Sequence, residues 1–318
     1  MKNLTLKPKL LASLMMMSLP LSVIADDTLK AINAEGNSHI ESAQLVSKTG
    51  IPKADRLVSY KHNGIALENN QGKTLSLLKG HFGSIDHRQL KQGLLLATVD
   101  LDRQQAMLTV LNDGSEKWTA TTYLPKPAFK IEGVCLYQDE AQNGFLFLVG
   151  EQGQGEQWLV ADATSPIALP QLIRHLSTPP DSEYCQVDDA QSRLYINEEK
   201  VGIWAYDAHP EAELSRFPIA MTHPFGQLTK SAVGMAIVPG GLLVLDAKAN
   251  VLHTYIDNKG SWQHQSEFAL HNVLEPEGIS ARVEGEQLEI AIKHDAGIAL
   301  YLTMDAYIAD IAPAYPAG

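Results

Sequence analysis

A repeat of about 48 residues runs through most of this chain and constrains its fold more than any other sequence feature. Short apolar runs begin at a corresponding place in each repeat, at Leu57, Leu94, Leu146, Leu194, Leu242 and Leu288. Most are followed, after a turn, by a second apolar stretch, so each unit contains a hairpin. Four short strands in a unit of about 40–50 residues are typical of a β-propeller blade. The sequence therefore predicts an all-β fold, a six-bladed β-propeller.

The same pattern predicts the domain organisation. No long segment has the 3.6-residue periodicity of an amphipathic helix, and two stacked β-sandwiches would not give one period along the whole chain. We expect a single domain over residues 26–303, in which residues 26–56 open the first blade or close the ring. The stretch 304–318 contains Pro313 and Pro316 and reads as a frayed tail or the start of a linker.

The first 25 residues have the parts of a secretory signal peptide. Lys2, Lys7 and Lys9 precede an apolar run, and a small-residue cleavage pattern ends at Ala25. Cleavage there predicts an exported protein, periplasmic or extracellular, with no membrane contact afterwards. The alternative is an uncleaved anchor, for which the run is short.

Charge and cysteine content limit the partners. The formal net charge is −12, and removal of the lysine-bearing leader makes it more negative. An acidic surface repels nucleic acid, so a polyanionic ligand would need bound metal or a local basic pocket. Cys135 and Cys185 are the two cysteines. Export permits their oxidation, but two cysteines are no disulfide framework, and the sequence leaves a bond between them open.

Acidic residues recur at one position of the repeat, whereas the common catalytic signatures are missing. Asp86, Glu132, Glu183 and Glu277 lie just before the hairpins, where the innermost strand of a blade is expected. Converging carboxylates are tolerated when a hard cation such as Ca²⁺ neutralises them, or when some bind protons. The alternative is that they are solvated turn residues. The eleven His residues show no ligand spacing, and we expect most of them at the surface.

One segment carries a resemblance to a known family. From Glu183 to Asp189 the chain has a block similar to E-G-x-x-x-D-D, followed by Leu194-Tyr-Ile-Asn-Glu198-Glu199 and by Ile203-Trp204-Ala-Tyr206. These elements closely resemble the signature of the β-propeller phytase family. Weaker similarity covers most of the remaining chain after residue 25.

The resemblance implies a secreted, calcium-dependent, six-bladed phosphoric monoester hydrolase of the 3-phytase type. Its substrate would be phytate, myo-inositol hexakisphosphate, or lower inositol phosphates, cleaved by water attack assisted by Ca²⁺. By position in the family motifs, the metal ligands would be Glu183, Glu199 and Glu277. The phosphate-binding residues would be Lys61, Arg88 and Arg103.

The chain also departs from the family pattern. Ser231-Ala-Val233-Gly stands where the family has a D-I-E-G motif, and Glu151 stands where it has a phosphate-binding lysine. The first of these changes removes two metal ligands, so we expect a depleted metal site. The alternative is a non-catalytic propeller that binds inositol phosphates or assists a second, intact phytase propeller. In this respect the chain resembles the incomplete N-terminal propeller of two-domain family members. A sugar- or lactone-acting propeller would need a His/Asp/Asn metal constellation, which the sequence does not offer.

Overall fold

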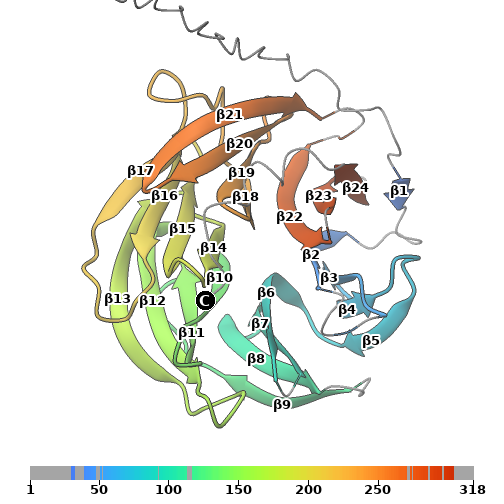
Figure 1. Cartoon of the computed structure of the whole chain (residues 1–318). Helices are drawn as coiled ribbons and strands as arrows, with labels where there is room; N and C mark the ends of the chain where they lie inside the picture. The colour runs from blue at the N-terminus through green and yellow to red at the C-terminus, as the bar shows by residue number, and fades with distance from the viewer. Residues whose placement is uncertain are drawn as a thin grey trace, which may run out of the picture.

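Six four-stranded antiparallel sheets are arranged around a central axis in the computed structural model (Figure 1). The structure describes residues 30–32, 39–47, 51, 53–91, 93–112, 117–270, 273, 275–285, 287–295 and 297–303. These residues contain no helix, so the prediction of an all-β, six-bladed β-propeller is confirmed. In the same ranges we find no helix of the length and apolarity that crossing a membrane requires. The predicted signal peptide 1–25 and tail 304–318 lie outside the described residues.

The first three blades follow one another along the chain, each from its innermost to its outermost strand. Blade 1 consists of β2 (Ile40–Leu45), β3 (Arg56–Tyr60), β4 (Gly64–Glu68) and β5 (Thr74–Leu78). Blade 2 consists of β6 (Phe82–Leu90), β7 (Gly93–Asp100), β8 (Gln105–Asn112) and β9 (Trp118–Tyr123). Blade 3 consists of β10 (Gly133–Gln138), β11 (Gly144–Val149), β12 (Gln152–Ala161) and β13 (Gln171–Pro180).

The remaining blades keep the order, except at the last outer strand. Blade 4 consists of β14 (Cys185–Asp188), β15 (Arg193–Glu198), β16 (Gly202–Asp207) and β17 (Arg216–Met221). Blade 5 consists of β18 (Gly234–Val238), β19 (Gly241–Asp246), β20 (Val251–Asn258) and β21 (Ser261–Ala269). Blade 6 consists of β22 (Pro276–Glu284), β23 (Gln287–His294), β24 (Gly297–Thr303) and β1 (Lys30–Ile32).

The apolar runs that revealed the repeat are the second strands of the blades. β7, β11 and β19 are buried along their whole length. Both faces of such a strand are covered by neighbouring blades, which explains a continuous apolar run instead of an alternating one. The outermost strand β21 alternates between exposed and half-buried residues, as expected for a strand with one solvated face.

Apolar side chains fill each interface between neighbouring blades. Between blades 2 and 3, for example, Leu95 and Leu108 pack in one cluster with Leu136 and Leu146. Corresponding clusters lie at the other five interfaces around the ring. Burying such side chains supplies about 1.5–3 kcal/mol each, and no blade can cover both of its own faces. The blades therefore stabilise one another only as a ring.

The ring is closed by the N-terminal strand and by one arginine. β1 pairs antiparallel with β24, with Lys30 opposite Leu300, and becomes the outer strand of blade 6. From β22, Arg282 donates to the Asp55 carboxylate at 2.5 Å and to the Val46 carbonyl at 2.6 Å, both next to strands of blade 1. Of the two roles expected for residues 26–56, β2 opens the first blade and β1 closes the ring.

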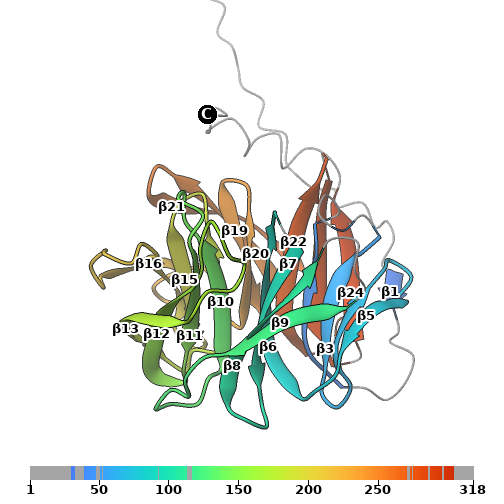
Figure 2. The same ribbon diagram turned by 90° about the horizontal axis from the view of Figure 1, so that it is seen from below.

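Each antiparallel blade begins at its innermost strand, so its turns lie alternately on two opposite faces of the ring, which Figure 2 shows from the side. We call the face at which the innermost strands begin the start face. It carries the residues just before β10, β14, β18 and β22. It also carries the turns between the second and third strands of blades 1 to 5, at residues 61–63, 101–104, 150–151, 199–201 and 247–250.

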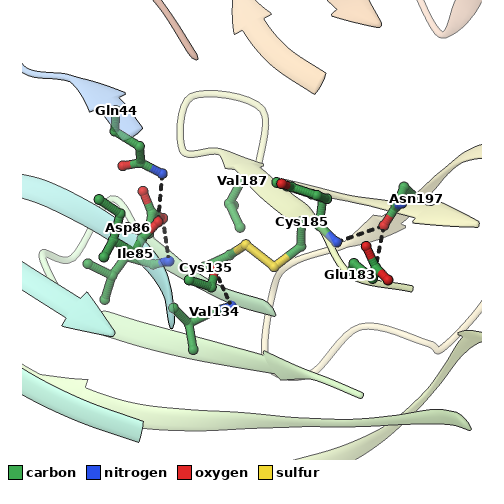
Figure 3. The surroundings of a disulfide bond; sticks show 12 residues. Gln44, Ile85, Asp86, Val134, Cys135, Glu183, Cys185, Val187 and Asn197 are labelled. Carbon is green, nitrogen blue, oxygen red and sulfur yellow. Dashed lines mark hydrogen bonds between the residues drawn. A yellow bond between two sulfur atoms is a disulfide. The ribbon is translucent and has the colours of Figure 1, made fainter. Parts of the chain in front are cut away.

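A disulfide bond joins the innermost strands of blades 3 and 4 (Figure 3). Cys135 of β10 and Cys185 of β14 are 50 residues apart, about one repeat, and their Cα atoms are 5.9 Å apart. Equivalent positions of consecutive repeats lie side by side because neighbouring innermost strands are aligned. The structure thus settles the pairing that the sequence left open.

Removing this disulfide should destabilise the protein measurably. Closing a loop of this size restricts the unfolded chain, which is worth about 2–4 kcal/mol. We expect a double variant, Cys135→Ser with Cys185→Ser, to unfold at lower denaturant concentration than the wild type by that amount. A reductant should lower the stability of the wild type but not that of the double variant. Equal stability of the two proteins under oxidising conditions would contradict the expectation.

Candidate functional site

Backbone hydrogen bonds between blades fix the start face. The Asp181 amide donates to the Glu151 carbonyl at 2.8 Å, the Glu199 amide to the Asp181 carbonyl at 3.2 Å, and the Ala232 amide to the Glu199 carbonyl at 2.7 Å. This series runs from the turn of blade 3 across the connection into blade 4 and on to blade 5. The side chains at these positions are therefore held around one region.

Four glutamates gather in this region of the start face. Glu132 directly precedes the innermost strand of blade 3, and Glu183 lies just before that of blade 4. Glu151 and Glu199 lie in the turns of the same two blades. Partial burial raises the pKa of Glu183, and the charges of Glu132, Glu199 and Glu151 raise it further, whereas Lys130 lowers it. The carboxylates are thus close enough to repel one another, and the region favours a cation.

Lysines partner three of the candidate carboxylates. Lys130 pairs with Glu132 at 2.6 Å, Lys248 with Glu199 at 2.6 Å, and Lys293 with Glu277. The sequence analysis missed these lysines. Lys248 could have been found, because it occupies the same turn of its repeat as Lys61 and Glu199 do in theirs. Lys293 could not, since only the register of β23 against β22 brings it to Glu277.

Glu277 stands apart from the other two predicted metal ligands. It lies in β22, and its backbone carbonyl accepts a hydrogen bond from the Tyr184 hydroxyl at 2.5 Å. Tyr184 follows Glu183, so the two glutamates flank one tyrosine. Within the described ranges, however, the glutamates of the start face do not bring three ligand atoms within 4.8 Å of one another.

Two of the three predicted phosphate-binding residues lie on the start face. Lys61 is exposed in the turn of blade 1, and its amide donates to the His39 carbonyl just before β2. Arg103 lies in the turn of blade 2 with 60% of its side chain exposed. Its guanidinium stacks on the ring of Tyr123, in the outermost strand, at 4.5 Å from the ring centre. Arg103 is therefore directed away from the axis.

Arg88 lies elsewhere, toward the opposite ends of the innermost strands. Its guanidinium donates to the Asp189 carboxylate at 2.8 Å, to the Leu136 carbonyl at 2.5 Å and to the Val187 carbonyl at 3.1 Å. It also donates to both carboxylate oxygens of Asp86. These bonds join blades 2, 3 and 4. Arg88 therefore holds the three blades together, and the predicted contact with phosphate would have to compete with these hydrogen bonds.

Asp86 likewise does not belong to the glutamate group. It lies in the middle of β6, and one of its oxygens accepts the Leu136 amide at 2.7 Å. A bulge between Phe82 and Ile85 lengthens β6, so the acid falls further along the strand than the repeat suggested. The repeat had predicted that Asp86 would take the same position in its blade as Glu132 does, which is nearer the start face.

The position of the missing family acids is buried around another carboxylate. Ser231 is fully buried, and its amide donates to Asp246 at 3.0 Å. The amides of Thr229 and Lys230 donate to the other oxygen of Asp246. Val233, two residues further on, is only partly buried and directly precedes β18. An acid at Val233 would therefore join the start face, whereas an acid at Ser231 would be repelled by Asp246.

Comparisons with known proteins agree with this architecture. The profile of the Phytase family matches residues 111–302. A "3-phytase" from Bacillus subtilis (strain 168) is 24% identical over 156 residues, which are 48% of this chain and 41% of that protein. Among solved structures, the β-propeller domain of Cps50 (Swd1) from Myceliophteria thermophila superposes with a TM-score of 0.57 at 11% identity, covering 82% of this chain and 83% of that one.

These findings define the class and then the family. The fold is a six-bladed β-propeller, and the solved structure supports that fold alone. Because the family profile matches more than half of the chain, the chain belongs to the Phytase family. The aligned part of the Bacillus protein is less than two thirds of its length.

Lysines already pair with several acidic residues that a cation at the start face would need. Ca²⁺ takes six to eight oxygen ligands, mainly from carboxylates and carbonyls. Burial, and after it the charges of the neighbouring glutamates, raise the pKa of Glu183, and a bound cation would offset this cost of ionisation. Because Glu199 pairs with Lys248 and Glu277 with Lys293, an ion at this face would have to displace these lysines.

Replacing Arg88 should destabilise the fold. Arg88→Ala leaves Asp86 and Asp189 without their cation, and we expect it to lower the free energy of unfolding by about 2–4 kcal/mol in urea denaturation. Arg103→Ala is the matched control, since its exposed ion pair is worth less than about 1 kcal/mol. Equal stability of the two variants would show that the Arg88 network is not structural.

Neutralising Glu183 should stabilise the protein at neutral pH. The raised pKa means that ionised Glu183 is less favourable in the folded than in the unfolded protein. Glu183→Gln removes that cost, so we expect a higher Tm near pH 7 in calcium-free buffer. The gain should disappear as the pH falls below the ordinary Glu range, where the carboxyl group is protonated in both states.

The control for this experiment is Glu140→Gln, which changes an exposed glutamate in a turn. Its Tm should follow that of the wild type across the pH range. A lower Tm of Glu183→Gln at pH 7 would mean that Glu183 makes a stabilising contact outweighing the repulsion.

Proposed function

We propose that the protein is a phosphomonoesterase that hydrolyses phytate or lower inositol phosphates at the start face. The observation that carries the proposal is the group of four glutamates on that face, where burial and the charges of Glu132, Glu199 and Glu151 raise the pKa of Glu183. Membership of the Phytase family and the similarity to a 3-phytase support the chemistry. The 3-phytase type, meaning the position of the first phosphate removed, is part of this proposal.

Positive charges on the same face would hold the substrate. Phytate is a dense polyanion, and the net charge of this chain is negative, so binding depends on local cations. Lys61 and Arg103 are exposed in the turns of blades 1 and 2. Lys130 and Lys248 lie among the glutamates of blades 3 to 5 and could exchange a carboxylate for a phosphate oxygen.

Calcium is the cofactor in this proposal. Glu183 and Glu199 would hold it. Glu277, on the other side of Tyr184, would be the third carboxylate ligand. When bound, Ca²⁺ offsets phosphate charge and orients water for attack at phosphorus. The backbone hydrogen bonds between blades keep the carboxylates in place. In this proposal Lys61 and Arg103 orient the substrate phosphates.

A second candidate function is favoured by the lysine pairs. Lys248 and Lys293 neutralise two of the predicted metal ligands without any metal. A propeller with its carboxylates engaged in this way could bind inositol phosphates and assist a separate, intact phytase propeller without turnover. Binding requires only the cations, whereas hydrolysis also requires an activated water.

Export of the protein belongs to the same proposal. The disulfide between Cys135 and Cys185 is stable in oxidising compartments and rare in the cytosol. This supports a periplasmic or extracellular location, in keeping with the predicted signal peptide.

Phosphate release from phytate, measured with and without calcium, distinguishes the two candidates. We expect the wild type to release phosphate slowly and only with millimolar Ca²⁺. Val233→Glu adds a carboxylate beside β18, at the repeat position of Glu132, so it should raise both calcium affinity and the rate of release about tenfold or more. Val233→Gln is the control of matched size and should behave as the wild type.

Binding measured by calorimetry completes the test. Lys61→Ala and Arg103→Ala should each weaken phytate binding severalfold, more at low salt than at high salt. Binding without any phosphate release in wild type and Val233→Glu would favour the non-catalytic function. No phytate binding at low salt would refute both candidates.

A further inference from the structure

We propose that His253, His264 and Glu267 form a binding site for a transition-metal ion of the Zn²⁺ class, on the outer two strands of blade 5. One nitrogen of each imidazole and one carboxylate oxygen lie within 4.8 Å of one another. The site is independent of the proposed phytase function and shares no residue with the glutamates of the start face.

The pairing of β20 with β21 creates the cluster. His253 of β20 lies directly opposite Glu267 of β21, and Tyr255 lies opposite His264. A register shift between Thr254 and Tyr255 places one extra residue in β21. Side chains of opposed residues share a face of the sheet, so His253, His264 and Glu267 all project to the same side. In a regular strand, residues three apart such as His264 and Glu267 would point to opposite faces, so the sequence alone does not indicate that they meet.

The distance between the imidazoles suits a shared metal ion. Nδ1 of His253 and Nε2 of His264 are 3.1 Å apart. Two nitrogens bound to tetrahedral zinc at 2.0–2.1 Å are about 3.3 Å apart, so binding requires little movement. Without metal, one of the two nitrogens must carry a proton that the other accepts. A metal ion replaces that proton and engages both lone pairs.

Burial prepares His253 as a ligand. Its side chain is fully buried, and Nδ1 is the nitrogen that faces His264 and would bind the ion. Burial lowers the pKa of His253, and the neighbouring His264 lowers it further, whereas Asp246 and Glu267 raise it. The neutral imidazole is the form that binds metal.

Aromatic contacts fix the second histidine. The ring of Tyr255 meets the ring of His264 edge-on, with 5.2 Å between ring centres. The two imidazoles themselves are 5.3 Å apart between ring centres. Such packing limits the rotamers of His264 and lowers the entropy cost of binding. His264 is half-buried and Glu267 exposed, so an ion can reach the site from solvent.

The ligand chemistry selects the metal. Two imidazoles and one carboxylate match the His₂Glu donor set of zinc sites, whereas Ca²⁺ prefers oxygen ligands only. Three protein ligands leave a fourth position for water. A bound ion would tie the outermost strand β21 to β20 and so stabilise the edge of blade 5.

Zinc titration of the full chain tests the proposal. After dialysis against a chelator, calorimetry with ZnCl₂ should show one ion per chain, bound at micromolar concentration or tighter and not displaced by millimolar CaCl₂. Zinc should also raise the Tm. Co²⁺ in its place should give the intense visible absorption of a tetrahedral complex.

Variants locate the ion. His264→Gln should weaken zinc binding at least a hundredfold and Glu267→Gln about tenfold, with unchanged circular dichroism. His209→Gln, which alters an exposed histidine in a turn, should bind zinc as the wild type does. The half-buried His264 is chosen because replacing fully buried His253 could impair folding. Absence of stoichiometric zinc binding, binding unaffected by His264→Gln, or displacement by calcium would each overturn the proposal.

Discussion

Closure of the ring is the constraint on which the rest of the structure depends. Each blade buries its faces only against its neighbours, so the first and last blades must also be joined. The pairing of β1 with β24 supplies the last outer strand from the other end of the chain. Arg282 adds charged hydrogen bonds to Asp55 across the same junction. Without this junction the positions on the start face, which come from different blades, would not be held around one axis.

The start face shows how a repeat distributes chemistry. Because corresponding positions of all repeats reach the same face, a change at one position of one repeat alters a shared site. Glu151 and Lys248 occupy corresponding turns and bring opposite charges to it. Lysine pairing of Glu199 and Glu277 balances acids that a metal would otherwise neutralise. A cation proposed for this face would therefore have to compete with these lysines, so the number of acids alone would not set its affinity.

Sequence reasoning succeeded where a property is repeated and failed where it depends on register. The period predicted the hairpins because turns follow strands at fixed spacing. The hydrogen bonds of Arg88 were not predicted, because its motif gives no sign that Asp189, about two repeats away, would accept them. The zinc-type cluster was hidden because a register shift in β21 brings His264 beside His253.

The sequence by itself determined the fold class, the number of blades and the strands that line the axis, since these follow from apolar periodicity and turn spacing. It also supplied the family resemblance. Only the tertiary structure decided which charges meet: the pairs of Glu199 with Lys248 and Glu277 with Lys293, and the bond between Cys135 and Cys185. The physical reason is that apolar patterning acts over a few residues, whereas ion pairs, disulfides and metal ligands depend on distances of a few ångströms between segments that only blade packing and strand register bring together.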